Sequence, residues 1–370
     1  MVEWKKLGDI CEIIRGNGVQ KTDFVESGVG CIHYGQIYTH YGPFTYTTNK
    51  FVSKEVFEKA RKASKGDIIM TDTSENVEDI CKSVAYLGEE DIAVSNHALI
   101  LKHKQNPKFL TYSTLTNSFL NQKRKYVVGA KVSGIKPEKL AQIKIYLPSL
   151  SEQQRIVEQL DTFTSSIENL KEQIAQRRKQ YEYYRDQLLD LEGKEGVEMK
   201  TLGEVCEVYT GGEVPINTIK GQTKPTKQHP YAVYTNGKET YGYTDTYKIE
   251  SDAVCISSIG ANTGAIFYKQ GKFTPAIRLK VLVPQKGIDC KYLFYACMNI
   301  DFAGRNTSSV PNINANYVKS KIVAIVPLSE QQRIVSILDT FESSINNLEQ
   351  QLAQREKQYE YYRNKLLTFE

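Results

Sequence analysis

The chain has 370 residues, of which 40% are hydrophobic and 25% are charged, so it is long enough for two or more domains with separate cores. It contains no apolar run near the roughly 18 residues of a membrane helix, and its first residues lack the apolar core of a signal peptide. Its seven cysteines form no CxxC pair, which favours reduced thiols over a disulfide framework or a zinc site. These totals predict a cytoplasmic protein with no membrane contact and no bound metal.

The net charge of +5 is spread unevenly along the chain. Residues 1–150 and 193–327 carry +5 each, whereas residues 151–192 carry −3 and residues 328–370 carry −2. Two basic blocks therefore alternate with two acidic ones. A basic block suits a polyanion such as a nucleic acid, although a solvated surface can show the same bias.

The first block, residues 1–149, has the pattern of a mixed domain. Alternating segments at 67–72 and 97–104 predict strands, and Gly and Asn mark the turns between segments. The segment FEKARKASK, residues 57–65, predicts a short helix. An α+β fold is the interpretation that fits these segments.

Polar, aromatic and basic residues of this block offer the chemistry of DNA binding. HYGQIYTHYG, residues 33–42, interleaves tyrosines with Gln and His, and NQKRKYVVGAK, residues 121–131, supplies four cations. Amides and hydroxyls pair with base edges, while Lys and Arg neutralise phosphates. Half-buried strand tyrosines and solvated basic faces are the structural alternative. The candidate DNA-binding residues of this block are Tyr34, Gln36, Tyr38, His40, Tyr41, Ser74, Asn76, Asn96, His97, Lys123, Arg124, Lys125 and Lys131.

One short motif in the first block raises the question of catalysis. Asn106-Pro107-Lys108-Phe109 resembles the NPPF/DPPY box of DNA amino-methyltransferases, but its third residue is Lys and no glycine-rich cofactor motif accompanies it. We interpret it as a turn that opens a helix. The sequence has no phosphate loop, HExxH motif or GxSxG elbow, and its five histidines have no ligand spacing. It therefore predicts no catalytic residue.

Residues 150–192 predict a long helix. Apolar residues recur in alternating steps of four and three, the spacing of a coiled-coil seam, over a length of roughly 60 Å. Ser151 and Gln154 form a capping-box pattern, with Glu152 in the first turn. Arg177 interrupts the seam, either to set the register with an acidic partner or as a snorkelling side chain. The predicted pairing residues are Ile156, Leu160, Phe163, Ile167, Leu170, Ile174, Tyr181, Tyr184 and Leu188.

The second block, residues 193–327, begins and ends like the first but differs between. VEWKKLGDICEI at 2–13 matches VEMKTLGEVCEV at 197–208, whereas the interiors diverge, as expected for two readers of different targets on a common mount. Its predicted strands are 253–258, 265–273 and 279–284, and its predicted helix is 291–300. Its candidate DNA-binding residues are Tyr234, Asn236, Lys238, Ser257, Ser258, Asn262, Arg278, Arg305 and Asn306.

The second helix, residues 328–370, repeats the first. Without gaps, the 40 residues from Leu150 and from Leu328 agree at 30 positions, including the capping pattern at Ser329 and the interrupting arginine, here Arg355. Neither seam can stay exposed, and the second block must begin where the first helix ends. We therefore predict an antiparallel pair of helices within one chain and a pseudo-twofold repeat; pairing between chains is the alternative. The predicted pairing residues are Ile334, Leu338, Phe341, Ile345, Leu348, Leu352, Tyr359, Tyr362 and Leu366.

With these features together, the chain resembles the DNA-specificity (S) subunits of Type I restriction–modification systems. The resemblance lies in the lines GDIIMTDTSENVED, GEEDIAVSNHALIL, YTNGKETYGYTDTY and ISSIGANTGAIFY and in the duplicated LSEQQRIV that opens each long helix. It spans essentially the whole chain. It implies two target-recognition domains, at 1–149 and 193–327, a central conserved helix at 150–192 and a distal one at 328–370.

The resemblance also implies a function and a set of partners. Each domain would read one half of a bipartite, asymmetric site in double-stranded DNA, and the helices would set the spacer and dock two modification subunits, with restriction subunits as further partners. The chain itself would be non-catalytic and hold no cofactor; S-adenosylmethionine, ATP and Mg would belong to partner subunits. The rival interpretations are a stand-alone adenine methyltransferase that uses residues 106–109 and a coiled-coil adaptor that ignores DNA.

Overall fold

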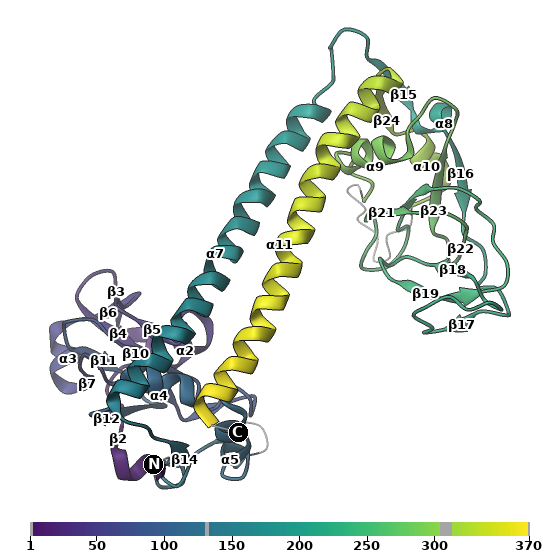
Figure 1. Ribbon diagram of the computed structural model, residues 1–370. Coiled ribbons are helices and arrows are strands. Elements are labelled where there is room, and N and C mark those ends of the chain that lie inside the picture. Colours follow the sequence, from purple (N-terminus) through teal and green to yellow (C-terminus); the bar gives the residue numbers. More distant parts are fainter. Residues whose placement is uncertain (1–2, 130–132, 304–312, 369–370) are drawn as a thin grey trace. The chain divides into compact units, whose positions relative to one another are not determined.

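The computed structural model describes residues 3–129, 133–303 and 313–368 (Figure 1). The chain divides into two units, Met1–Lys171 with Gln350–Glu370, and Glu172–Glu349. Each unit holds one globular domain together with part of helix α7 (Leu150–Leu189) and part of helix α11 (Leu328–Thr368), drawn in teal and yellow in Figure 1. No helix of the described residues is both long enough and apolar enough to span a membrane.

The first domain contains two five-stranded sheets, ordered β2-β12-β8-β10-β5 and β3-β6-β4-β11-β7. A 3₁₀ turn lies at Lys21–Asp23. The remaining elements are β1 (Trp4–Lys6), α1 (Leu7–Ile10), β2 (Cys11–Arg15), β3 (Phe24–Val25), β4 (Val29–Ile32), α2 (Tyr34–Thr39), β5 (Phe44–Thr45), β6 (Lys50–Val52), α3 (Lys54–Lys59), β7 (Arg61–Ala63), β8 (Ile68–Thr71), β9 (Thr73–Ser74), β10 (Ser83–Tyr86), β11 (Ile92–Val94), β12 (Ala98–His103), α4 (Pro107–Ser113), α5 (Asn117–Arg124), β13 (Ser133–Gly134), α6 (Pro137–Leu140) and β14 (Lys144–Tyr146).

The core of this domain lies on both faces of the central strand β8. Because side chains alternate along a strand, Ile68 and Met70 face one side and Ile69 faces the other. Ile68 and Met70 pack in a buried cluster with helices α4, α5 and α7, while Ile69 packs against residues of the second sheet. The helix α7 is therefore part of the domain's own core.

The second domain repeats this plan with four-stranded sheets, ordered β16-β23-β20-β21 and β17-β19-β18-β22. Val254 and Ile256 of its central strand join a cluster with α9 and α11, and Ala253 and Cys255 face the other sheet. Its elements are β15 (Glu198–Thr201), α8 (Leu202–Val205), β16 (Cys206–Thr210), β17 (Ile219–Lys220), β18 (Tyr231–Tyr234), β19 (Thr240–Thr244), β20 (Ala253–Ile256), β21 (Ile266–Lys269), β22 (Phe273–Pro275), β23 (Lys280–Pro284), α9 (Cys290–Met298), α10 (Ala315–Lys319) and β24 (Ile322–Ile325).

The two long helices pair antiparallel within each unit, as predicted. In the first unit Phe163 stacks on Tyr362, with ring centroids 5.4 Å apart, and Lys171 pairs with Glu356 at 3.4 Å, so the contacts ascend α7 as they descend α11. In the second unit the ring of Tyr184 stacks on Phe341 at 5.3 Å, and Arg178 bonds Glu349. The residue numbers again rise along α7 as they fall along α11, so the helices are antiparallel.

The seams are covered by the domain cores as well as by the other long helix, which the prediction did not include. Ile156 and Leu160 of α7 are buried in the core of the first domain, and Ile334 and Leu338 of α11 are buried in the core of the second, so their first turns dock on a domain. Farther along, the seam tyrosines stay partly open. Tyr184 is 46% exposed and Tyr362 is 41% exposed.

The interrupting arginines meet aromatic rings. Arg177 lies over the ring of Phe341 at 5.8 Å, and Arg355 lies over the ring of Phe163 at 5.9 Å, the matching position of the other repeat. Both distances are within the reach of a cation–π contact. The arginines therefore stack across the helix pair, and an acidic partner is not what holds Arg177 here.

Two local predictions were wrong. Ser151 does not cap α7: the cap is Ser149, whose hydroxyl accepts from the N–H of Glu152, and α11 begins after Pro327, so Ser329 lies inside its first turn. The capping pattern was displaced because the serine two residues earlier, or the proline, already starts the helix.

Of the short predicted helices, 291–300 corresponds to α9, but 57–65 is helical only through Lys59, where α3 ends. The chain then extends at Ala60 and continues as β7, which pairs with β11. Sheet pairing with a distant strand overrides the local helix propensity of this segment.

Candidate nucleic-acid interface

The two domains share one pattern of backbone hydrogen bonds, which allows their residues to be matched. The N–H of Gly16 donates to Ala98 in the first domain, and that of Gly211 donates to Leu279 in the second. A Cβ at Gly16 would lie 2.3 Å from the Ser95 oxygen, so this close approach requires glycine. The shared register matches Arg15 with Thr210, Tyr34 with Asn236, Asp72 with Ser258 and His97 with Arg278.

One matched pair has unusual backbone geometry in both domains. His97 has φ +62° and Arg278 has φ +60°, the left-handed region that residues other than glycine rarely adopt. His97 directly precedes β12, and Arg278 lies two residues before β23. Strained residues that persist at the same place in two divergent domains indicate a functional edge of the sheet.

In the first domain, predicted residues from three separate segments meet at this edge. The rings of Tyr34 and His97 lie 5.5 Å apart, and Tyr38 packs edge-on to Tyr34 at 6.5 Å. Ser74 and Asn76 form part of the same hollow. The residues that line it are Tyr34, Tyr38, Thr73, Ser74, Glu75, Asn76 and Asp79.

Two neighbours of this hollow were missed by the sequence reasoning. Asp72, at the end of β8, is fully buried, and its Oδ2 accepts a hydrogen bond from Nη2 of Arg15 at 2.5 Å. The Arg15 side chain is 58% exposed. Comparing what precedes the recurrent glycine in EIIRGN and EVYTGG would have singled out Arg15, because the two blocks place Arg and Thr at the same position.

Two predicted contacts of the first domain, Gln36 and Lys123, are wrong because these side chains are buried, whereas the contact of the partly exposed Tyr41 stays a prediction. The amide of Gln36 accepts from the N–H of His33 and donates to Asn49, and the hydroxyl of Tyr41 also bonds Asn49. Lys123 is 1% exposed. Gln36 and Lys123 therefore lie inside the domain, whereas Tyr41 is partly exposed.

Lys123 shows why a basic run is a poor predictor of phosphate contact. Its ammonium group donates to the carbonyls of Glu78 and Ile80 at 2.9 and 2.8 Å, and burial lowers its pKa. The adjacent Arg124 pairs with the Glu78 carboxylate at 2.8 Å. Together they tie α5 to the loop that follows β9.

The other candidates of the first domain remain on the surface. His40 and Lys125 are exposed, and Asn96 is exposed although its side-chain oxygen accepts from the N–H of Gly18. Lys131 lies outside the described residues. Of the thirteen predicted residues, those that the structure brings into one place are Tyr34, Tyr38, Ser74, Asn76 and His97.

In the second domain Asn236 is the centre of the corresponding edge. Its side-chain oxygen accepts from the N–H of Ser258 at 2.7 Å, and its amide donates to the carbonyl of Ile277. Asn262 reaches its backbone oxygen at 3.4 Å. The loops after β18, β20 and β22 are thereby joined.

The two serines of this edge are structural. Ser257 and Ser258 are fully buried, and their hydroxyls donate to the carbonyls of Asn236 and Arg278. They cannot reach a base edge, so their predicted DNA contacts are wrong. Arg278 itself is exposed.

Two further candidates of the second domain, Tyr234 and Lys238, contact a buried lysine. Nζ of Lys269 lies 4.0 Å from the ring of Tyr234 and donates to the carbonyl of Lys238, whose own side chain is exposed. Tyr234 is therefore half-buried, and its ring packs against the ammonium group of Lys269. Arg305 and Asn306 lie outside the described residues.

The repeated helix entrance positions each domain on its helix. Oε1 of Gln153, in the first LSEQQRIV, accepts from the N–H of Asn106 at 3.0 Å, and Oε1 of Gln331, in the second, accepts from the N–H of Asp289 at 2.7 Å. Both glutamine side chains are buried. Asn106 and Asp289 are the N-caps of α4 and α9, so each glutamine binds the start of a domain helix.

The motif NPKF belongs to this anchor. Asn106 caps α4 by accepting from the N–H of Phe109, as interpreted from the sequence. Lys108 and Tyr112 both bind the carboxylate of Asp161 on α7, each at 2.6 Å. In the second domain Lys291 and Tyr295 bind Asp339 of α11 at 2.7 and 2.6 Å.

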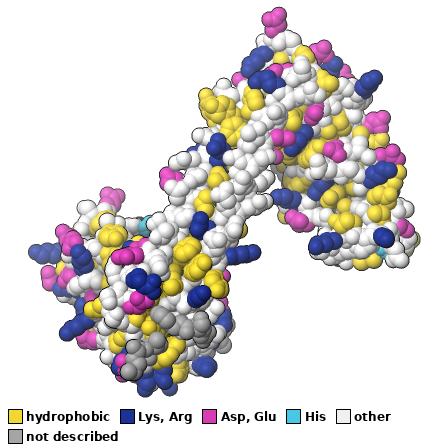
Figure 2. All heavy atoms as spheres, in the orientation of Figure 1, with side chains coloured by type: hydrophobic (Ala, Val, Ile, Leu, Met, Phe, Trp, Pro, Cys, Tyr) yellow, Lys and Arg dark blue, Asp and Glu magenta, His cyan; other side chains and the backbone are white. Residues whose placement is uncertain are grey.

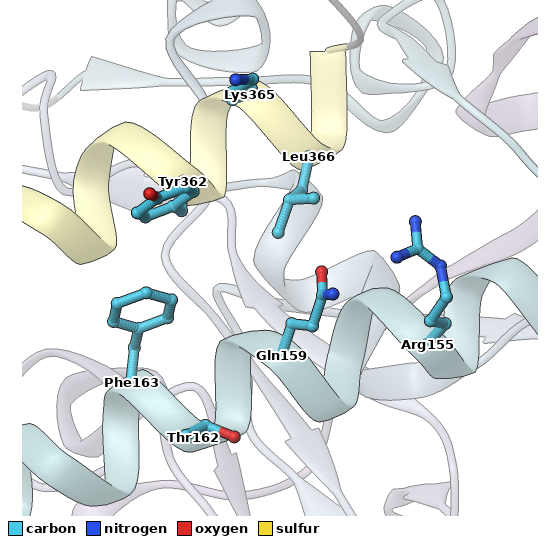
Figure 3. Close-up of a pocket in the computed structure, with 7 residues that line it drawn as sticks. All are labelled: Arg155, Gln159, Thr162, Phe163, Tyr362, Lys365 and Leu366. Atoms are coloured by element: carbon cyan, nitrogen blue, oxygen red, sulfur yellow. The ribbon is translucent and has the colours of Figure 1, made fainter.

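An apolar groove runs along the helix pair in the first unit. Figure 3 shows the rings of Phe163 and Tyr362 facing each other across it, with Leu366 beside them. Arg155, Gln159, Thr162 and Lys365 complete its lining. The equivalent stack of Tyr184 and Phe341 is present in the second unit.

Neither the charges on the face shown in Figure 2 nor a metal-binding cluster among the described residues marks a second kind of site. On the face shown in Figure 2, basic and acidic side chains are interspersed over both domains. Within the described ranges, no group of three or more His, Cys, Asp or Glu residues could hold a metal ion. All seven thiols are unpaired, and six of them are buried.

Comparison with known proteins identifies a family. The family model described as "Type I restriction modification DNA specificity domain" matches residues 1–177 and again residues 194–356. A putative type I specificity subunit of Mycoplasma pneumoniae is 28% identical over 308 residues, covering 78% of this chain and 90% of its own length. The EcoR124I/EcoR124II specificity subunit of Escherichia coli is 34% identical over 247 residues, 60% of each chain.

A solved structure has the same fold. The S subunit of a Type I restriction–modification system from M. genitalium superposes with a TM-score of 0.65, covering 99% of this chain and 96% of that one, at 16% sequence identity. At that identity the likeness is one of architecture: two α+β domains and two long helices.

Proposed function

Because this chain belongs to the Type I restriction–modification DNA-specificity family and carries two target-recognition domains, we propose that each domain reads one half of a bipartite, asymmetric site in double-stranded DNA. The modification and restriction subunits of such a system are its partners. The chain has a recognition role, and the chemistry belongs to those partners with their S-adenosylmethionine, ATP and Mg.

The observation that carries this proposal is the pair of matched edges. The same backbone register presents Tyr34 and His97 in one domain and Asn236 and Arg278 in the other. The exposed guanidinium of Arg278 presents a different hydrogen-bond pattern from those of Tyr34 and His97, and base edges in the major groove are distinguished by such patterns. Different side chains at matching backbone positions favour two different half-sites.

We infer that the helices dock the modification subunits and set the spacer. The groove at Phe163 and Tyr362 is apolar and open, and Tyr184 with Phe341 repeats it, so two equivalent surfaces suit two copies of one partner. Aromatic residues are enriched at protein interfaces, where they anchor binding. The role of NPKF as a helix cap speaks against the rival methyltransferase interpretation.

The test is exchange of one domain. Residues 193–327 are replaced by those of another family member, the chain is co-expressed with its modification subunits, and host DNA is sequenced for methylated bases. We expect one half-site to change and the other to persist. Changes in both half-sites would refute the assignment of one half-site to each domain.

The adaptor rival is tested by salt. Phosphate contacts release counterions, so the logarithm of the binding constant of the assembled complex for its site should fall linearly with the logarithm of salt concentration. An adaptor that ignores DNA would show no sequence-specific affinity at any salt concentration. The same titration with an unrelated duplex is the control.

A further inference from the structure

Asp72 is a carboxylate with no exposure to solvent and an incomplete set of hydrogen bonds. Its Oδ2 accepts from Arg15, while its Oδ1 is buried without a hydrogen-bond partner among the described residues. Nδ1 of His97 lies 3.7 Å from Oδ1, beyond hydrogen-bond distance. A buried charged oxygen without a partner is costly and indicates a function.

The two side chains that Asp72 faces both reach the surface. The Arg15 side chain is 58% exposed and the His97 side chain is 57% exposed, whereas Asp72 itself is inaccessible. Asp72 is fixed by its place at the end of β8 and by two backbone bonds, from its N–H to His97 and from the N–H of Ile135 to its carbonyl. A rigid buried acid therefore lies between two outward-pointing side chains, the guanidinium of Arg15 and the imidazole of His97.

This arrangement suits reading of bases rather than of phosphates. A guanidinium held through one nitrogen loses less conformational freedom on binding, and its remaining N–H groups are presented in a fixed plane. Such a fork matches O6 and N7 of guanine, the most frequent specific contact of arginine. Glu75 and Asp79 on the adjacent hollow would repel phosphates, and carboxylates accept from the N4 amino group of cytosine.

The second domain lacks the acid at the matched position. Ser258 replaces Asp72, Thr210 replaces Arg15, and the hydroxyl of Ser258 bonds the backbone oxygen of Arg278. Within the part of the chain that the structure describes, Arg278 forms no ion pair with a carboxylate. The buried acid is therefore particular to the first domain, as a determinant of one half-site should be.

We propose that Asp72 is a positioning residue that orients Arg15 and His97 toward base edges, and that Arg15 contacts a guanine in the half-site of the first domain. This inference rests on the proposed function, since it specifies which residues of one domain determine its half-site. Asp72 does not touch DNA. It acts by holding Arg15 through Oδ2 and by offering its free Oδ1 as a hydrogen-bond acceptor to His97.

The experiment compares three variants in the assembled methyltransferase, with methylated-base sequencing of host DNA as the readout. Asp72→Asn keeps the shape and removes the charge, and Arg15→Gln removes the fork. Both variants should lower the preference for one G·C pair in the first half-site. The loss of selectivity should be roughly 5- to 150-fold, the discrimination that one bidentate contact provides. The second half-site, read by the other domain, should stay unchanged in the same cells.

The matched control is Asp67→Asn, at the other end of β8. Asp67 is also a buried aspartate with a cationic partner, Lys102 at 2.8 Å, so this variant loses a comparable ion pair without touching the proposed reading edge. It should keep both half-sites. Relaxation by Asp67→Asn equal to that of Asp72→Asn would attribute the effect to stability and overturn the proposal.

Two further outcomes separate this inference from the function on which it rests. Unchanged selectivity in Arg15→Gln, which is exposed and should fold, overturns the positioning role even if Asp72→Asn proves insoluble. A wild-type complex that methylates DNA without a bipartite site would refute the proposed function itself. Relaxation confined to the first half-site supports both.

Discussion

The anchor of the second domain on its helix can be tested by a double-mutant cycle between Tyr295 and Asp339. Tyr295 is fully buried and donates its hydroxyl to the Asp339 carboxylate at 2.6 Å, and burial, with this hydrogen bond second, raises the pKa of Tyr295 far above its usual range. The tyrosine is thus a donor at every accessible pH. A hydrogen bond to a charged group contributes about 1.5–3 kcal/mol.

The ion pair in the same anchor contributes less. Lys291 lies 2.7 Å from Asp339, but their side chains are 29% and 35% exposed, so solvent screening limits the pair to about 1 kcal/mol at most. We therefore expect Asp339→Ala to cost about 2–4 kcal/mol and the cycle with Tyr295→Phe to give a coupling of about 1.5–3 kcal/mol.

The measurement is urea-dependent hydrogen exchange read by mass spectrometry on peptides of α9, which reports the free energy of opening of that region. Asp186→Ala is the control, because Asp186 is an exposed α7 aspartate paired only with its neighbour Arg185, and it reports the gain in helix propensity alone. A coupling energy below about 0.5 kcal/mol would show that the anchor does not hold the domain.

Four other outcomes follow from the structure. Removing seven residues from each long helix shortens each by about 10 Å, so methylated-base sequencing should show a spacer about three base pairs shorter with both half-sites intact; an unchanged spacer would contradict the role of the helices. Tyr362→Ser, in the groove, should weaken co-purification with modification subunits at least tenfold, whereas Tyr46→Ser, which is more exposed but away from the helices, should not. Burial raises the pKa of most of the thiols to about 12, so the native protein should resist iodoacetamide at pH 8 and react after unfolding in urea; rapid labelling of the native protein would refute this. Burial also lowers the pKa of His103 below 6.5, so the unfolded state binds more protons and the first domain should lose stability as pH falls through 6.5; thermal unfolding of His103→Asn should show a weaker pH dependence, and equal slopes would contradict the assignment.

The long helices and their pairing direction were predictable because their signals are local and repeated. A seam of apolar residues in steps of four and three specifies a helix without knowledge of the rest of the chain, and the start of the second block at the end of the first helix sets the direction. The covering of the seam was not predictable. Ile156 and Leu160 pack on the domain core, and no periodicity distinguishes that surface from a facing helix.

The reading edge was only partly predictable, for a different reason. Segments that supply Tyr34, Ser74 and His97 were identified by residue type, yet composition could not tell which polar groups the fold uses internally. Lys123 and Ser258 have the same side chains as exposed DNA-binding residues but are buried. Arg15 was missed because a lone arginine at a strand end acquires meaning only from the buried Asp72, 57 residues away.

The duplicated segment LSEQQRIV holds each domain on its long helix, whereas the divergent interiors supply the residues that differ between the two domains. Gln153 and Gln331 hold the N-caps of α4 and α9, and Asp161 grips the first domain through Lys108 and Tyr112 much as Asp339 grips the second. These contacts involve the helices α4 and α9 and do not use the residues that follow β8 and β20, so those residues are free to differ between domains. The core side chains of β8 and β20 lie between the anchoring helices and the opposite sheet. Asp72 and Ser258, which follow these strands, form no contact of the anchors, so they can be exchanged for other residues without disturbing the anchors. A domain whose reading edge varies while its anchoring contacts persist can change the DNA half-site it selects and still be mounted on the same helix.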